Sequence, residues 1–165
     1  LRLRMEFLDP QRNQDLYPDD PLAPACYPPE YLFAIVMFSN PLAFFEVSEL
    51  GDLFTDNCRQ LISIWKAHRN HIIHGMIYPI GQLPDGTTWT GFWVDGKEHR
   101  YLLIFREVNA VDSVTFCLPT TWPDTDNIVR LAGCGTFERL AHARIAITIS
   151  KPQSYLLLHG YQEDA

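Results

Sequence analysis

The first seventy-five residues alternate between strand-like and helix-like patterns of apolar positions. Residues 2–8 switch between apolar and charged side chains with a period of two, which predicts a strand. Residues 30–40 follow two prolines and are apolar nearly all round, which predicts a buried helix. Residues 42–47 form a short, mostly apolar run, which predicts a second strand of the kind found in parallel sheets. An apolar stripe with three- and four-residue steps then predicts a helix from about Ser48 to Gly75.

From residue 76 onward the pattern changes to short strands separated by turns. Turn-forming sequences such as Asp95-Gly96 recur at short intervals and favour hairpins. The segments between the turns are rich in β-branched and aromatic residues, and they are residues 87–94, 100–108, 113–118, 128–131, 143–149 and 154–159. Many short strands at this spacing are typical of a β-sandwich.

These patterns predict a mixed α+β chain in two parts. Residues 1–75 predict the order β-α-β-α, whose strands should pair in parallel through right-handed crossovers. Because two strands cannot form a stable parallel sheet with both faces covered, we expect this part to be the end of a larger barrel or open sheet. Residues 76–165 predict an all-β antiparallel sandwich domain.

Composition narrows the classes of partner. Hydrophobic residues make up 47% of the chain and charged residues 20%, as in a globular protein. The net charge of −7 argues against nucleic acid and against a polybasic membrane anchor, because both depend on clustered positive charge. The longest fully apolar run, residues 31–38, is too short to span a bilayer. The chain starts at Leu1 without an initiator methionine, which favours a fragment of a longer protein.

The four cysteines are expected to behave as buried, reduced side chains. None of them stands in a CxxC pair, so zinc-ribbon and thioredoxin-like spacings are absent from the sequence. We therefore expect a cytoplasmic protein, although one disulfide remains an alternative. The sequence also contains no P-loop, GxGxxG or GxSxG motif, so it predicts no cofactor and no serine-nucleophile elbow.

Polar residues after the two predicted strands are the candidate substrate contacts. Glu6, Asp9, Arg12 and Asn13 end or follow the first strand, and Glu46 ends the second. In a (β/α)₈ barrel these positions face the active site, where carboxylate, amide and guanidinium groups can hold sugar hydroxyls. The alternative is a solvated loop with an aspartate turn, and for Glu46 an ion pair with a nearby cation.

Three histidines crowd the end of the long predicted helix. His68, His71 and His74 are three residues apart, whereas a zinc site on a helix favours histidines four apart. We therefore expect a basic helix end, which suits the helix dipole, and no metal site.

Three tryptophans could serve either the core or sugar binding. Alternation places Trp89 and Trp93 on one face of a strand, and Trp122 lies in a predicted loop. Exposed, coplanar rings would suit a carbohydrate-binding module, whereas a sandwich needs one face of that strand for its core.

Several segments, in order along nearly the whole chain, resemble the C-terminal part of α-galactosidase (melibiase)-type glycoside hydrolases. They are residues 5–13 (MEFLDPQRN), 27–34 (YPPEYLFA), 40–46 (NPLAFFE), 64–69 (IWKAHR), 79–92 and 101–107 (YLLIFRE). The resemblance implies the last β/α units of a catalytic barrel, followed by the sandwich that closes such enzymes. It also implies a retaining mechanism with two carboxyl groups, both on earlier strands. The catalytic pair would then lie upstream of Leu1, and the chain alone would be inactive.

Three functions are open, the first of them implied by the resemblance and the other two by the patterns of the sequence. The first is the C-terminal portion of a hydrolase of α-galactosides or related α-glycosides, whose five candidate residues line the rim of the pocket. The second is a non-catalytic carbohydrate-binding sandwich. The third is a structural domain that pairs with another copy or with the missing N-terminal part of the enzyme. The sequence specifies neither the sugar nor the linkage.

Overall fold

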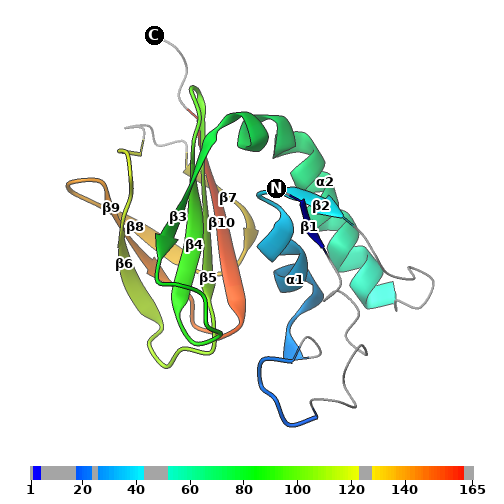
Figure 1. Ribbon diagram of the computed structural model, residues 1–165. Helices are drawn as coiled ribbons and strands as arrows, with labels where there is room; N and C mark the ends of the chain where they lie inside the picture. Colours follow the sequence, from blue (N-terminus) through cyan, green and yellow to red (C-terminus); the bar gives the residue numbers. More distant parts are fainter. Residues whose placement is uncertain (1, 5–17, 24–25, 43–51, 123–127, 162–165) are drawn as a thin grey trace. The chain divides into compact units, whose positions relative to one another are not determined.

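The computed structural model of the chain describes residues 2–4, 18–23, 26–42, 52–122 and 128–161 (Figure 1). The chain divides into two compact units, residues 1–69 and 70–165. Helix α2 runs across the division between them. No helix among these residues is long and apolar enough to cross a membrane.

The first unit contains a β-α-β arrangement. Strands β1 (Arg2–Arg4) and β2 (Asn40–Leu42) pair in parallel, with Leu3 opposite Pro41, and helix α1 (Pro29–Val36) lies between them in sequence. The parallel pairing was expected from the alternation of strand and helix patterns. The described part of this unit has two strands, so a (β/α)₈ barrel is not seen in it.

Helix α1 is shorter than the apolar pattern predicts. It begins at Pro29, whose fixed φ suits the first turn, and most of its side chains are buried. It ends at Val36 because Ser39 closes the last turn: its N–H and its hydroxyl both donate to the Val36 carbonyl, at 3.1 and 2.6 Å. Pro41 then follows and cannot continue a helix.

Helix α2 (Asp52–His74) confirms the long predicted helix. Cys58, Leu61 and Ile72 are buried along its apolar stripe. The helix stops at Gly75, but not through the left-handed conformation that a C-cap glycine usually adopts. A Cβ at Gly75 would lie 2.4 Å from the Val94 side chain, so close packing against β4 is what requires glycine there.

The second unit is built from two antiparallel sheets, which agrees with the predicted sandwich (Figure 1). The larger sheet has the order β3-β4-β5-β10-β7, and the smaller has the order β6-β9-β8. The strands of the larger sheet are β3 (Met76–Gly81), β4 (Trp89–Asp95), β5 (His99–Arg106), β10 (Ser154–Tyr161) and β7 (Ile128–Gly133). Those of the smaller sheet are β6 (Ser113–Cys117), β9 (Arg144–Thr148) and β8 (Thr136–Leu140).

The two sheets share one apolar core. Its fully buried members include Trp93, Leu102 and Ile104 from the larger sheet and Ile147 from the smaller one. Complete burial of one such side chain stabilises the fold by roughly 1.5–3 kcal/mol. The core therefore accounts for the close packing of the sandwich.

Two buried charged side chains hold the loops at one end of the sandwich. Arg106 is 4% exposed and donates to the carbonyls of Asn109, Ile149 and Ser150. Glu107 is 8% exposed, and one of its carboxylate oxygens accepts bonds of 2.8–2.9 Å from the Gly86 N–H, the Thr88 N–H and the Thr88 hydroxyl. Buried charges are tolerated when they are hydrogen-bonded in this way.

The expectation of four buried cysteines is wrong for three of them. All four are free thiols, but Cys26, Cys117 and Cys134 are exposed. Cys117 is exposed because its strand, β6, alternates and turns Phe116 to the core instead. Cys58 is buried, and burial, together with the charge of Glu30, raises the pKa of its thiol to about 11. A thiol of that pKa stays protonated and unreactive near neutral pH.

Candidate functional site

The five residues predicted to contact substrate lie outside the described part of the chain. They are Glu6, Asp9, Arg12, Asn13 and Glu46. The strands that precede them are described, and Arg4 pairs with Leu42 at the carboxyl end of the parallel pair. Their role as substrate contacts therefore stays a prediction.

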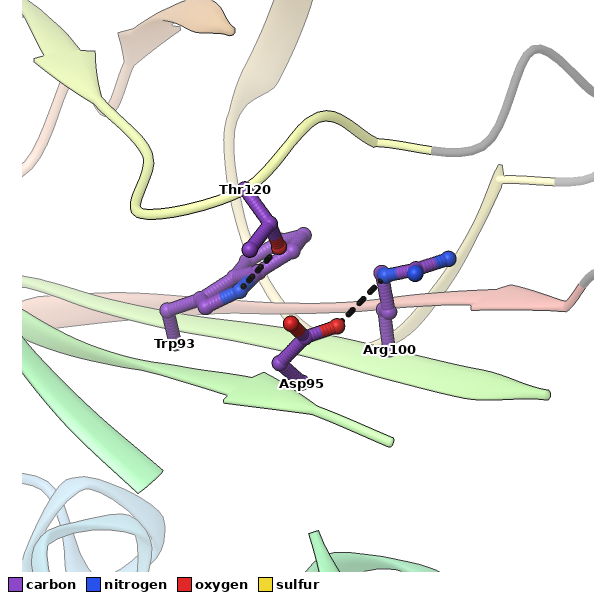
Figure 2. Close-up of polar contacts among 4 residues, drawn as sticks. All are labelled: Trp93, Asp95, Arg100 and Thr120. Atoms are coloured by element: carbon purple, nitrogen blue, oxygen red, sulfur yellow. Dashed lines mark hydrogen bonds and ion pairs between the residues drawn. The ribbon is translucent and has the colours of Figure 1, made fainter. Parts of the chain in front are cut away.

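The tryptophans of β4 fill the core, which contradicts the exposed, coplanar rings expected of a carbohydrate-binding surface. Trp89 is 4% exposed and Trp93 is fully buried. Their indole N–H groups donate to the Val111 carbonyl at 3.1 Å and to the Thr120 hydroxyl at 3.2 Å. Figure 2 shows the second of these bonds, which fixes the loop after β6 over the Trp93 ring. Both rings are structural.

A cavity of about 440 Å³ opens where β6 ends near the turn between β8 and β9. Its volume falls in the range of about 300–1,000 Å³ typical of small-molecule sites. The lining residues are Leu118, Thr121, Trp122, Arg139, Leu140, Ala141, His142, Ala143, Arg144 and Ile145. Leu118, Trp122 and Ile145 are buried members of the core, so the cavity has an apolar floor and a polar rim. We call it the β8–β9 cavity.

The described residues that line the rim of the β8–β9 cavity have positive or neutral side chains. Arg139 and Arg144 line it together with the imidazole of His142, and none of its described lining residues is Asp or Glu. The chain as a whole carries a net charge of −7. A positively charged rim on an otherwise acidic chain favours the binding of anions over cations.

The turn that forms this rim is held in an unusual backbone conformation. His142 and Ala143 have φ angles of 61° and 54°, in the left-handed region that costs a residue with a Cβ roughly 1–2 kcal/mol. The turn is fixed by the Leu118 N–H, which donates to the Ala143 carbonyl at 2.8 Å. Arg144 adds a second bond, from its Nε to the Ala141 carbonyl at 3.3 Å. The rim is therefore preorganised by the surrounding backbone.

Trp122 forms part of the cavity floor and is 5% exposed. Its ring meets Trp93 edge to face, with ring centroids 4.8 Å apart. Its indole nitrogen lies against Gly160, where a Cβ would come within 2.4 Å of it. The buried N–H has no hydrogen-bond partner among the residues described. The floor therefore has an unsatisfied polar group, and leaving such a donor unpaired costs about 1–3 kcal/mol.

A second group of ionisable side chains joins the end of α2 to the larger sheet. His99 Nδ1 and His159 Nε2 share a hydrogen bond of 2.9 Å, and the His71 ring lies 3.8 Å from the His99 ring. Tyr101 and Tyr161 stack or pack on these rings. We call these five residues the histidine–tyrosine cluster. The rings of the cluster pack on one another. Within the described ranges, no group of three His, Cys, Asp or Glu side chains could hold a metal ion.

Burial and charge perturb the titration of this cluster. Desolvation, followed by the neighbouring His71, lowers the pKa of His99, and Glu98 partly opposes that shift. Burial also raises the pKa of the Tyr101 hydroxyl. His71, at the predicted basic helix end, therefore contacts His99 on β5, a contact that the histidine spacing did not indicate. The signal available in the sequence was a histidine on each of two strands whose centres are apolar, β5 and β10.

Comparisons with known proteins give little direct guidance. No protein-family model matches the chain, and no curated protein matches it. One similar solved structure is the crystal structure of Thermotoga maritima alpha-fucosidase in complex with a mechanism based inhibitor. The match has a TM-score of 0.41 and 8% sequence identity, and it covers 81% of this chain and 34% of that chain. The chain thus spans about a third of that enzyme's length, and at this similarity neither fold nor activity is transferred from it.

Proposed function

We propose that the chain is the C-terminal portion of a retaining glycoside hydrolase that acts on α-galactosides or related α-glycosides. The observation that carries this proposal is the parallel pairing of β1 and β2 across α1, followed by α2 and an antiparallel sandwich. This order of elements is the one that the resemblance to the α-galactosidase type leads us to expect. The sequence segments suggest the family, and the order of elements in the structure supports that suggestion.

The β1–β2 pair also supports the predicted location of substrate contacts. Carboxyl ends of parallel neighbouring strands lie at the same edge of a sheet, and in a (β/α)₈ barrel that edge holds the active site. Glu6 follows the end of β1 by two residues, and Glu46 follows the end of β2 by four. In the proposal these carboxylates bind sugar hydroxyls at the rim, and the nucleophile and the acid/base come from earlier strands.

The test compares the chain with the complete protein from which it comes. The isolated chain is expected to release no nitrophenol from nitrophenyl α-galactoside, whereas the complete protein is expected to hydrolyse it with retention of anomeric configuration. In the complete protein, Asp9→Asn and Glu46→Gln should lower kcat/KM about tenfold or more, because each removes a charged hydrogen bond to substrate. Glu138→Gln, on exposed β8, is the matched control and should change nothing.

Two results would contradict the proposal. One is robust turnover by the isolated chain, since that would place the catalytic pair within it. The other is a complete protein that hydrolyses no α-galactoside or related α-glycoside.

A further inference from the structure

We propose that the β8–β9 cavity binds a sugar acid, meaning a polyhydroxylated ring that carries one carboxylate. The cavity belongs to the sandwich, so the inference adds a second site to the proposed hydrolase. The choice of a carboxylate comes from the side chains of the rim. The choice of a sugar over other carboxylates rests on the proposed function.

Arg144 is the group that would bind the carboxylate. Its Nε already donates to the Ala141 carbonyl at 3.3 Å, which restricts the side chain to the rim. Its two terminal nitrogens have no partner among the described residues, and the side chain is exposed. A guanidinium presents parallel N–H groups that match the two oxygens of a carboxylate. Arg144 is therefore positioned and available for an anion.

The other lining groups suit the hydroxyls and the ring of a sugar. The Thr121 hydroxyl and the His142 imidazole line the same rim and can both donate and accept hydrogen bonds. The apolar floor of Leu118, Trp122 and Ile145 suits the C–H face of a pyranose ring. A site built from an apolar floor and a few fixed polar groups is the usual form of a small-ligand pocket.

The backbone around the rim favours binding because it is already ordered. His142 and Ala143 occupy the left-handed region, and the Ala143 carbonyl is held by the Leu118 N–H at 2.8 Å. Residues kept in such conformations by their surroundings are frequent at ligand sites. A ligand that enters this rim does not have to order the turn first, which removes part of the entropic cost of binding.

The experiment is isothermal titration of the chain with D-galacturonate, and with D-galactose as the neutral ligand of the same ring. We expect saturable binding of galacturonate and binding of galactose that is weaker by about tenfold or more, the effect of losing a charged hydrogen bond. Arg144→Gln should weaken galacturonate binding by a similar factor. Arg130→Gln, an exposed arginine on β7 outside the cavity, is the matched control and should bind like the unaltered chain.

Further titrations test separately whether binding needs the sugar ring, the carboxylate and Arg144. Citrate supplies carboxylates without a ring and should bind at least tenfold more weakly than galacturonate. Equal binding of citrate, equal binding of galactose, or no effect of Arg144→Gln would each overturn the proposal. Failure here leaves the hydrolase assay unaffected, because that assay reports on the first unit and on the upstream residues. Near-ultraviolet circular dichroism of each variant shows that a loss of binding is not a loss of fold.

Discussion

Two groups of charged side chains in the same sandwich use their hydrogen-bonding capacity in opposite ways. Arg106 and Glu107 are buried, and each bonds to several backbone groups of neighbouring loops. Arg144 and His142 lie on the rim of the β8–β9 cavity, and the bond from Arg144 Nε to Ala141 is the one hydrogen bond described for either side chain. Charge alone therefore does not distinguish a structural residue from a candidate binding residue.

The difference indicates where to look for function in a chain of this kind. A buried charge that is hydrogen-bonded to the backbone of neighbouring loops stabilises one arrangement of that backbone. A charge at a cavity with unoccupied donors contributes little to folding and remains able to bind an anion. Stability measurements should therefore separate the two groups clearly.

The largest expected effect is from Arg106→Ala. This change leaves the buried carbonyl of Ile149 and the partly buried carbonyls of Asn109 and Ser150 without their donor. We expect the free energy of unfolding to fall by about 3 kcal/mol, because a buried acceptor that loses its donor costs about 1–3 kcal/mol and partly buried acceptors cost less. Urea denaturation followed by tryptophan fluorescence measures it. Arg130→Ala, at an exposed position, is the control and should change the free energy of unfolding by less than about 0.5 kcal/mol. An equally small change for Arg106→Ala would contradict the distinction between buried structural charges and rim charges.

A smaller loss is expected from Gly160→Ala, which connects the fold to the cavity floor. The new methyl group would come within 2.4 Å of the Trp122 indole nitrogen and about 3 Å of two other atoms of that ring. Overpacking of this kind costs about 1–3 kcal/mol and should displace the Trp122 ring. Thermal unfolding measures the first effect. Near-ultraviolet circular dichroism measures the second, and a spectrum identical to that of the unaltered chain would show that the ring is not held against Gly160.

Ala143→Gly should stabilise the protein slightly. Alanine at φ 54° pays a steric cost of about 1–2 kcal/mol, whereas glycine adopts this conformation freely but adds entropy to the unfolded chain, at about 0.5–1 kcal/mol. The expected net gain is about 0.5 kcal/mol in the free energy of unfolding. Ala141→Gly is the control, because Ala141 has no positive φ, and it should destabilise. A loss of stability in Ala143→Gly would mean that the turn is not strained.

The smallest effect is a pH dependence of stability from the histidine–tyrosine cluster. The pKa of His99 is lower in the folded chain than its ordinary value of 6.5. Below pH 6.5 the unfolded chain therefore binds this proton first, so stability falls as the pH drops through that range and levels off below the folded pKa. His99→Gln should make the decline shallower between pH 7.5 and pH 5.5, as measured by urea denaturation. An unchanged slope would show that His99 is not the group responsible.

The sequence predicted the elements with a clear apolar period and missed those without one. The helix α2 and the central strands β5 and β10 were expected because burial imposes their apolar pattern. Strands β3 and β8 were not expected, because both lie at sheet edges and expose most of their side chains. Pro79, inside β3, is tolerated there because an edge strand has unpaired backbone groups.

The candidate site was harder to predict because its residues come from distant parts of the chain. Thr121, Arg139 and Arg144 line one cavity only after β6 has been placed next to β9. In the same way, His99 and His159 are 60 residues apart and meet because β5 pairs with β10. No local spacing records such contacts, so motif analysis directed attention to the carboxylates after the first two strands instead.

The site in the sandwich can be tested most directly through the indole N–H signals of the four tryptophans in a ¹⁵N-labelled chain. Trp122 lines the cavity, whereas Trp89 and Trp93 donate to backbone and side-chain acceptors within the fold. Addition of D-galacturonate should shift the Trp122 signal, assigned with Trp122→Phe, and leave the Trp89 and Trp93 signals in place; Arg144→Gln should abolish that shift. A Trp122 signal that stays fixed at saturating galacturonate, or that moves equally in Arg144→Gln, would contradict a sugar-acid site in this cavity.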